Sequence, residues 1–412
     1  MESAWEIEGF ERYSKLKEDK TADVVIVGGG LAGMWSAYLL SKAGKKVVLI
    51  EKDRVGRGET LYTTAFITQM IDTDLVDLID IFGKKDARLS WQAGIDAIDL
   101  IESVIREESI ECDFKREPIF SYAATAEEFE SLEKENKSAK ELGFNTELKK
   151  DIDLGFEHEG VWEVDNQAKY HPMKFFKGLV EAAIKHGAVI HERTEADRIL
   201  GKGPVRIVTK DGQKITAQDV IVATYKPFNN PSTTHFKKGM YVSYVYELRI
   251  KPGSVKRGMY EDLENPYHYV RVDELNHKYD RMIVGGEDHR EEIKLPPKKN
   301  FTALDEYIKE TFPTLEYVIA TKWSGKILEP SDGLPLIGEA EPHMFVATAF
   351  SGNGMTYSAI SGRILTDLIL GKKNPYADLY DPKRSLSPKA LLKKGKDYAG
   401  EFFGGAGKNI FK

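Results

Sequence analysis

A glycine-rich turn between two apolar segments constrains the fold of this chain more than any other feature. Asp23–Val27 has the composition of a buried strand, and the turn Gly28–Gly33 follows it at once. Met34–Ala43 has the pattern of a helix, which Gly44 ends. The apolar run Lys46–Ile50 completes a strand–helix–strand unit of about 30 residues, the length that a parallel crossover needs. The sequence therefore predicts an α/β fold.

The glycines of this turn fit the pattern G-x-G-x-x-G, which is specific only where it follows a strand and opens a helix, as it does here. Gly28 allows the tight turn, Gly30 lets a pyrophosphate approach the backbone, and Gly33 lets the helix pack on the sheet. The amides of Leu31–Gly33 face the anion, and Glu51, at the end of the next strand, accepts hydrogen bonds from a ribose. The alternative is a turn that only packs helix on strand. The motif alone leaves FAD and NAD open.

Composition excludes several classes of function. The 412 residues include 59 Lys and Arg and 66 Asp and Glu, so the net charge of −7 disfavours a nucleic-acid partner, which needs a basic face. One cysteine, Cys112, excludes an intramolecular disulfide and an iron–sulfur or zinc–cysteine centre held by this chain alone. We therefore expect no metal site and a reducing, cytoplasmic compartment. The uncharged stretches Val24–Ser41 and Met344–Gly362 contain glycine clusters, and we therefore expect no membrane span there.

Three later segments complete a nucleotide-binding pattern. Val220–Thr224 is a strand-like run after a series of alternating strands. Gly333–Gly338 precedes the apolar run Met344–Ala349, and Phe350–Thr356 is a glycine turn that opens a helix. Together with the first glycine motif, these segments resemble the D-amino acid oxidase superfamily of FAD-dependent oxidoreductases, which includes glycine oxidase and sarcosine oxidase. The resemblance covers residues 22–382.

Other motifs resemble the branch of bacterial flavoproteins that carry a C-terminal Rieske domain, namely Thr63–Ala65, Asn166–Pro172, Gly285–His289 and Asp367–Gly371. No Cys-x-His pair follows residue 382. We therefore expect a member without the Rieske domain, or a chain cut before it. The segment Ala390–Lys412 resembles the part that precedes that domain.

The resemblance implies a Rossmann-like FAD-binding domain of the glutathione-reductase type, interleaved with an α+β substrate domain on a mixed or antiparallel sheet. We expect the discontinuous FAD-binding domain at residues 22–84, 166–228 and 326–382. We expect the substrate domain at residues 85–165 and 229–325. An N-terminal arm, 1–21, and a basic C-terminal tail, 383–412, flank them.

The resemblance also implies non-covalent FAD, because Trp323–Gly333 lacks the cysteine that carries flavin in sarcosine oxidases. The first glycine loop and its acid hold the ADP half, and the loop from Arg54 to Thr68 runs beneath the pyrophosphate and flavin. The turn Gly352–Thr356 leads a helix N-terminus toward the flavin carbonyl, where a positive dipole end stabilises the reduced anion. The predicted cofactor residues are Gly28, Gly30, Leu31, Ala32, Gly33, Glu51, Lys52, Thr60, Thr63, Thr64, Ala65, Ala196, Gly338, Gly352, Asn353, Gly354, Met355 and Thr356.

Catalytic residues are predicted on the strands of the substrate domain. Glu287 and His289 lie in a glycine-rich motif from which they reach the open face of the flavin, and Lys326 holds a carboxylate or assists oxygen. The alternatives are a solvated hairpin turn and a surface lysine. Tyr244, Tyr246 and Tyr269 are candidates for an aromatic wall, against ordinary sheet packing.

One position departs from the glycine oxidase pattern. There an arginine anchors the substrate carboxylate, and the aligned residue here is Ile327. A simple amino-acid substrate is therefore less well supported, and Arg249 and Arg271 are the fallback anchors.

The sequence predicts an FAD-dependent oxidoreductase that oxidises a C–N bond of an amino acid or related amine, with hydride transfer to flavin N5. One alternative is a flavin dehydrogenase that passes electrons to a protein partner. Another is a flavin-binding subunit without turnover of its own. Expected partners are a small amine or amino acid and an electron-acceptor protein, and neither nucleic acid nor a membrane.

Overall fold

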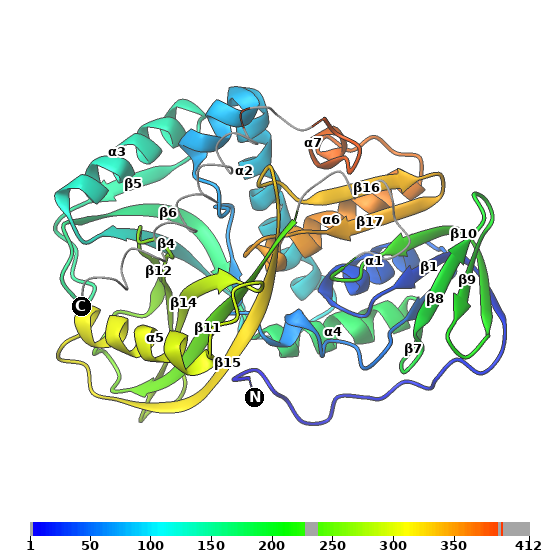
Figure 1. Cartoon of the computed structure of the whole chain (residues 1–412), viewed down its shortest axis with the longest axis horizontal. Helices are drawn as coiled ribbons and strands as arrows, with labels where there is room; N and C mark the ends of the chain where they lie inside the picture. The colour runs from blue at the N-terminus through cyan, green and yellow to red at the C-terminus, as the bar shows by residue number, and fades with distance from the viewer. Residues whose placement is uncertain (1–2, 227–237, 386–388, 390–412) are drawn as a thin grey trace.

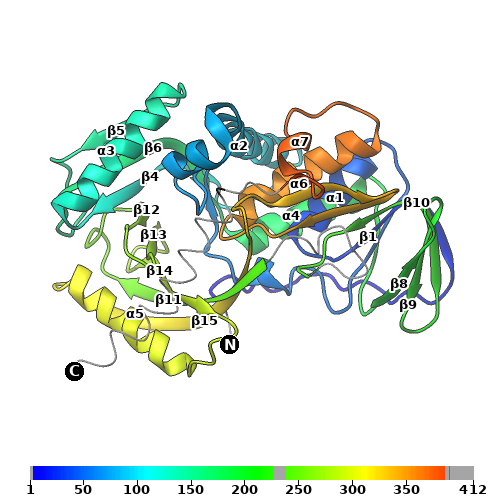
Figure 2. The same ribbon diagram turned by 45° about the horizontal axis from the view of Figure 1, so that its top comes forward.

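The structure is a computed structural model that describes residues 3–226, 238–385 and 389. These residues form two sheets, each with its own helices, which lie next to each other in both views (Figures 1 and 2). Residues 229–237 of the expected substrate domain and most of the expected basic tail, 386–388 and 390–412, lie outside the described residues. Within the described part of the chain, no helix combines the length and apolarity that crossing a bilayer requires.

The first sheet has the order β16-β17-β10-β1-β2-β7, and β8 and β9 continue from β10 as antiparallel strands. Strands β17, β10, β1, β2 and β7 are parallel neighbours, and β16 is antiparallel to β17. The strands are β1 (Lys20–Val27), β2 (Val47–Ile50), β7 (Val189–His191), β8 (Ala196–Leu200), β9 (Val205–Thr209), β10 (Lys214–Val222), β16 (Leu336–Glu341) and β17 (Met344–Thr348).

Helices cover the first sheet because its central strands are apolar on both faces. Val24–Val27 are all buried, as parallel strands usually are. Helix α1 (Leu31–Lys42) packs between α4 (Pro172–Lys185) and α6 (Gly354–Ile369). The apolar face opposite these helices is closed by the β8–β9 hairpin, whose Val205 and Ile207 are buried. The sheet therefore has covers on both faces, and its strand ends are left for a ligand.

The second sheet has the order β15-β11-β14-β13-β12-β4-β6-β3, with β5 beside β6. It is mixed, since β12 and β4 are parallel while the other pairs are antiparallel. Its strands are β3 (Phe66–Ile67), β4 (Lys115–Ala123), β5 (Thr146–Lys149), β6 (Gly160–Lys169), β11 (Lys238–Ile250), β12 (Gly258–Glu261), β13 (Tyr269–Glu274), β14 (Asp280–Arg290) and β15 (Tyr317–Pro330). The predicted α/β fold with a mixed second sheet is confirmed.

Two helices cover the second sheet, and a third connects it with the helices of the first. α3 (Ala126–Glu141) packs on β4, β5 and β6, and α5 (Pro297–Thr311) packs on β11 and β14. Helix α2 (Leu75–Glu107) lies between the two sheets in both views and contacts α3 and α6 (Figures 1 and 2). Its backbone leaves the helical conformation at Gly83, where φ is 82°. The remaining short helices are η1 (Glu59–Leu61) and α7 (Ala377–Tyr380).

Strands run through the domain boundaries that the sequence suggests. β6 crosses the expected boundary at 165/166, and β15 crosses the one at 325/326. β3, which lies within the segment 22–84, pairs with β6 of the second sheet. The chain thus passes between the two sheets inside regular elements, and the division into domains stays a prediction.

The N-terminal segment before β1 is an extended arm that holds the loop following β2. Trp5 is fully buried, and its Nε1 donates to Thr63 O at 2.6 Å. Ser3 Oγ donates to Leu61 O at 2.6 Å. Two hydrogen bonds to backbone carbonyls therefore fix the loop that the sequence places beneath a cofactor.

Candidate active site

A cavity of about 1820 Å³ begins at the carboxyl ends of β1 and β2 and reaches the second sheet. Gly28 and Glu51 line its first end, where parallel strands of α/β proteins usually bind their ligands. Ser243 and Tyr269 line the end at the second sheet. One continuous space therefore connects a nucleotide-type turn with the strands of the second sheet.

Glycine occupies the three motif positions of the turn for different structural reasons. A Cβ at Gly28, where φ is 115°, would lie 2.6 Å from Ala223 O, and one at Gly33 would lie 2.0 Å from Gly28 O. These two positions are glycine because the backbone packs closely. Gly30 lines the cavity, and its Cβ would meet only Thr60 Oγ1, at 3.5 Å. The space beside Gly30 is therefore available to a ligand rather than filled by protein.

The ligand at this end would be an anion with a ribose next to it. Helix α1 begins here with no acidic residue in its first turn, and Leu31 and Ala32 line the cavity. Leu31 N donates to Thr60 Oγ1 at 3.1 Å, and the helix dipole with the following amides of the first turn favours a phosphate. Glu51 accepts hydrogen bonds from Gly29 N at 2.7 Å and Asp53 N at 2.9 Å, which fix its carboxylate at the cavity wall. This arrangement fits the pyrophosphate and ribose of a dinucleotide.

Most of the predicted cofactor residues line this cavity. Lys52 and Ala196 lie at its nucleotide end, as the sequence suggests. The others on the wall are Gly28, Gly30, Leu31, Ala32, Glu51, Thr60, Thr63, Thr64, Gly352, Asn353, Gly354 and Met355.

Four predicted cofactor residues are absent from the cavity wall: Gly33, Ala65, Gly338 and Thr356. Thr356 Oγ1 donates to Thr68 O at 2.9 Å and accepts from Thr68 N at 3.1 Å, so it fastens α6 to the loop. A Cβ at Gly338 would lie 2.9 Å from Pro382 Cδ. Thr356 therefore acts on the site through the loop, and contact of these four residues with a cofactor stays a prediction.

The turn before α6 is held by a residue that the sequence reasoning missed. Asp72 Oδ2 accepts from Gly352 N at 2.7 Å, and Asp72 N donates to Asn353 Oδ1 at 3.2 Å. Asn353 Nδ2 in turn donates to Met70 O at 2.8 Å. Asp72 follows no motif, so only the fold reveals that it meets a turn 280 positions later.

The three predicted catalytic residues are not brought together. Only Lys326 lines the cavity; its Nζ lies 2.6 Å from Glu291 Oε1, and its backbone N donates to Glu59 Oε2. Glu287 is absent from the wall, and its Oε1 lies 3.3 Å from Nε2 of His268. The His289 ring stacks on Tyr244, on the face of the sheet that α5 covers. Their catalytic roles stay predictions.

The predicted aromatic wall is wrong for two of its three members. Tyr244 and Tyr246 pack against Phe301 of α5, whereas Ser243 and Val245, which alternate with them along β11, line the cavity. Nothing in the sequence pattern indicates that α5 covers the tyrosine face, and strand alternation then directs both rings away from the cavity. Tyr269 lines the cavity as expected, together with Tyr267, which was missed.

Arg271 is not a carboxylate anchor, and this fallback prediction is wrong. The side chain is buried, and its Nη1 donates to the carbonyls of Thr64 and Ala65, the latter at 3.0 Å. Its Nη2 donates to Tyr170 O, and its Nε donates to Asp273 at 2.7 Å. The guanidinium is thus committed to the loop beneath the cavity. The other fallback anchor, Arg249, is absent from the cavity wall and pairs with Glu247 at 3.0 Å.

Residues 23–368 match the protein family described as FAD dependent oxidoreductase. The chain belongs to this family. It is 31% identical over 377 residues to the putative Rieske 2Fe-2S iron-sulfur protein YhfW of Bacillus subtilis (strain 168). The matched region covers 90% of this chain and 73% of that protein. The predicted resemblance to the D-amino acid oxidase superfamily is confirmed.

Two solved structures share the fold. The L-proline dehydrogenase from P. horikoshii superposes with a TM-score of 0.74 at 20% identity, over 90% of this chain and 98% of that one. The glycine oxidase from Geobacillus kaustophilus superposes with a TM-score of 0.73 at 18% identity, over 89% of this chain and 99% of that one. The FAD-dependent oxidoreductase family implies FAD, and the open space at Gly30 and the N-terminus of α1, with no acid in its first turn, fit that cofactor.

Sequence reasoning missed two half-buried acids at the second sheet, Glu261 on the cavity wall and Asp288 next to the wall residue Ser243. Glu261, at the end of β12, accepts a hydrogen bond from Ser121 Oγ at 2.7 Å. Burial raises the pKa of Glu261 to about 7, although the Ser121 hydrogen bond lowers it. Burial also raises the pKa of Asp288 to about 7, against a hydrogen bond from Ser243. Asp288 Oδ1 has no hydrogen-bond partner among the described residues.

A β-bulge gives Asp288 its position. Val242 pairs with His289 and Tyr244 with Gly286, so Glu287 and Asp288 together face Ser243. Glu287 adopts the left-handed region, with φ 55°. Bulges redirect side chains, and single-sequence patterning does not reveal where they occur.

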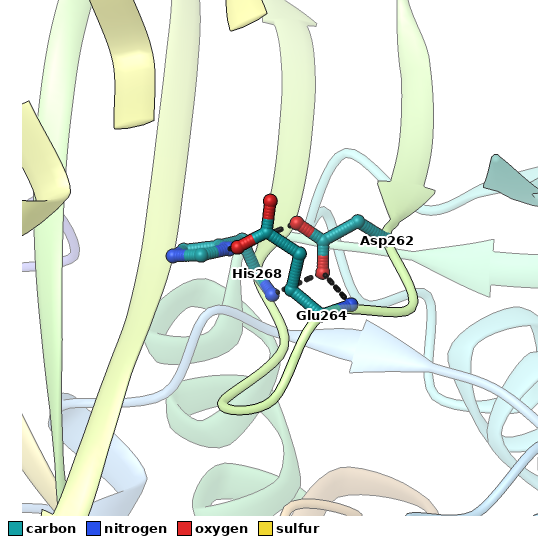
Figure 3. A group of neighbouring side chains, drawn as sticks. All are labelled: Asp262, Glu264 and His268. Atoms are coloured by element: carbon teal, nitrogen blue, oxygen red, sulfur yellow. Dashed lines mark hydrogen bonds and ion pairs between the residues drawn. The ribbon is translucent and has the colours of Figure 1, made fainter. Parts of the chain in front are cut away.

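A cluster of acids surrounds His268 in the loop between β12 and β13. Figure 3 shows Asp262, Glu264 and His268 converging there. His268 Nδ1 lies 2.8 Å from Asp262 Oδ2, and its Nε2 faces Glu287. Burial lowers the pKa of His268, but the hydrogen bonds to Asp262 and Glu287 outweigh burial and raise the pKa to about 9. An imidazolium with both nitrogens bonded to carboxylates has no lone pair for a metal ion.

This histidine makes stability depend on pH. Because its folded pKa lies above the ordinary 6.5, its stabilisation is complete below pH 6.5 and is lost as pH rises through 9. We expect wild type to lose about 3 kcal/mol more unfolding free energy than His268→Gln between pH 6 and pH 9.5. Urea unfolding of both proteins at the two pH values measures the difference. The exposed His277→Gln is the control; equal slopes for His268→Gln and wild type would refute the linkage.

Proposed function

We propose that this chain is an FAD-dependent oxidoreductase that oxidises a carbon–nitrogen single bond of an amine or amino acid. The observation that supports it is the single cavity that joins the glycine turn Gly28–Gly33 to the second sheet at Tyr269. A cofactor bound along the turn would present its reactive ring to a substrate lying on that sheet. The solved relatives named as glycine oxidase and L-proline dehydrogenase act on compounds with such bonds.

The proposed reaction balances as a two-electron oxidation. The C–H bond next to nitrogen breaks, its hydride leaves with two electrons, and the nitrogen loses a proton, so that C–N becomes C=N. FAD, when bound, supplies the acceptor for the hydride. The chain's own residues bind and orient the substrate against the second sheet and exclude water from it.

We propose that FAD is held without a covalent bond to cysteine. Cys112 is the one cysteine of the sequence, and it is buried in the core away from the cavity wall. Burial raises the pKa of its thiol to about 12, which disfavours the reactive thiolate. Acid precipitation is expected to release all the flavin into the supernatant.

The test is an anaerobic titration of the purified, flavin-loaded protein with amines and amino acids, followed by the visible flavin band. Bleaching by at least one donor is the expected result. If no donor of either class bleaches the flavin while dithionite does, the proposed reaction is wrong.

A second electron path has one observation in its favour, the similarity to a protein named as a putative Rieske iron-sulfur protein. In that case electrons leave the reduced flavin for a protein acceptor. Hydrogen peroxide measured in air distinguishes the two: one peroxide per substrate oxidised indicates an oxidase, and a much smaller yield with fast reduction of an artificial one-electron acceptor indicates a dehydrogenase.

A further inference from the structure

The end of the cavity at the second sheet is lined by carboxylates. Asp72, Asp74, Glu261 and Asp262 all lie on its wall. The negative charges of Asp74 and Asp72 help to raise the pKa of Glu261, so these groups are close enough to repel one another. His268 already offsets the charge of Asp262. The mutual repulsion of Asp72, Asp74 and Glu261 falls when a cation binds among them.

Glu261 is well placed to meet a ligand. Among the described residues its carboxylate accepts one hydrogen bond, from Ser121, which orients it from the neighbouring strand β4. A carboxylate has lone pairs for about four hydrogen bonds, so acceptor capacity remains on the cavity side.

Aromatic rings stand beside these acids. Tyr267 and Tyr269 line the wall with centroids 5.8 Å apart, and Phe66 meets Tyr269 edge-on at 6.1 Å. Gly285 makes room for this arrangement, because a Cβ there would lie 2.1 Å from the Tyr269 ring. Aromatic faces attract alkylammonium groups through the ring quadrupole, independently of the carboxylates.

Acids outnumber cations on the described wall at this end: Lys134 of α3 is an exposed lysine, whereas four carboxylates line the wall. Arg271 donates to backbone carbonyls, and the wall residue Ile327 carries no charge. Lys326, on β15 of the second sheet, is paired with Glu291. A substrate carboxylate would therefore enter beside like charges, which disfavours it.

From these observations we propose that the substrate is an amine with a second positive charge, such as a diamine, and without a carboxylate next to the reacting carbon. Glu261 and Asp72 face the charged ammonium group, and the rings of Tyr267 and Tyr269 pack along the alkyl chain. The other nitrogen is neutral when it reacts, because the hydride departs only with help from its lone pair. This inference rests on the proposed function and names its substrate class.

The test measures binding apart from turnover. The flavin of the loaded protein is first reduced with dithionite, so that a bound amine cannot be oxidised, and three ligands of similar length are titrated by calorimetry: 1,4-diaminobutane, butylamine and 4-aminobutanoate. We expect the dissociation constant of the diamine to be at least about tenfold below that of 4-aminobutanoate. Tighter or equal binding of 4-aminobutanoate overturns the proposal.

Matched variants locate the site. Glu261→Gln keeps the size of the side chain and an oxygen for Ser121, and we expect it to weaken diamine binding by about tenfold. Asp74→Asn, at the start of α2, is a second variant that removes a nearby charge and weakens the diamine by a smaller factor. Glu127→Gln, an exposed acid of α3 at the cavity edge, changes the constant less than about twofold. Unchanged binding in the first two variants refutes the assignment.

The two proposals fail in different ways. If the diamine binds as expected but no amine bleaches the oxidised flavin, the reaction class is wrong and the cation site stands. If an α-amino acid bleaches the flavin and outcompetes the diamine in the reduced protein, the reaction class stands and the cation site is wrong.

Discussion

Replacing Gly30 by valine is expected to weaken FAD binding by at least about 100-fold while the protein keeps its fold. Gly30 has φ −81° and ψ −174°, which L-amino acids adopt without strain. Its Cβ would meet no protein atom closer than Thr60 Oγ1 at 3.5 Å, so the branched side chain extends into the cavity. There it occupies the space through which a pyrophosphate reaches the N-terminus of α1.

The measurement is an FAD titration of the apoprotein, with thermal unfolding of the apoprotein alongside it. For Gly30→Val we expect the apoprotein to melt at the same temperature as wild type while its binding of flavin is lost. Gly33→Ala is the contrasting variant, since its Cβ would lie 2.0 Å from Gly28 O and the backbone must move. That variant is expected to lose stability as well as flavin. Wild-type flavin affinity in Gly30→Val would show that the cofactor does not pass this turn.

The nucleotide end of the cavity was predictable because its determinants are local in sequence. A glycine needed for close backbone approach, a helix start and an acid after the next strand lie within 24 residues, Gly28 to Glu51. The pattern implies the geometry, because a strand–turn–helix unit allows few alternatives. Thr60, Thr63 and Thr64 were found by resemblance, and they line the cavity.

The reactive end was much less predictable because it is assembled from distant strands. Whether Tyr244 or Ser243 faces the cavity depends on which face of the sheet α5 covers. The alternation of side chains along β11 is compatible with either orientation, so it does not decide between them. The bulge opposite Ser243 then shifts the positions of Glu287 and Asp288 by one residue. Glu261 and Asp72 carry no local motif at all.

Arg271 shows how a residue type was recognised but its role was misassigned. A lone arginine on a substrate strand is compatible with a carboxylate anchor, and the sequence does not tell what lies behind the strand. The structure places the loop Thr64–Ala65 and the arm residue Trp5 there, with the guanidinium 5.2 Å from the indole. Three backbone carbonyls need donors at that point, and the guanidinium supplies them.

Arg271→Met is accordingly expected to lower the unfolding free energy by about 3–5 kcal/mol, the largest loss of stability that we predict. Removal of the guanidinium leaves the carbonyls of Thr64, Ala65 and Tyr170 without a donor. It also leaves Asp273 paired only with Lys169, at 2.8 Å. Flavin affinity is expected to fall too, because the freed loop lines the cofactor cavity.

The comparison that isolates this effect is Arg57→Met, which removes an arginine paired with Glu6 of the same N-terminal arm at 3.1 Å. That pair is partly exposed, so its loss is expected to cost less than about 1 kcal/mol. Arg271→Lys keeps the positive charge, but its ammonium group lacks the planar geometry with which the guanidinium donates to three carbonyls. We expect its unfolding free energy to lie between those of wild type and Arg271→Met. Urea unfolding of the three apoproteins, with FAD titrations, measures both quantities. Equal stability of Arg271→Met and Arg57→Met would mean that the carbonyls find other donors and that the arginine is available to a ligand after all.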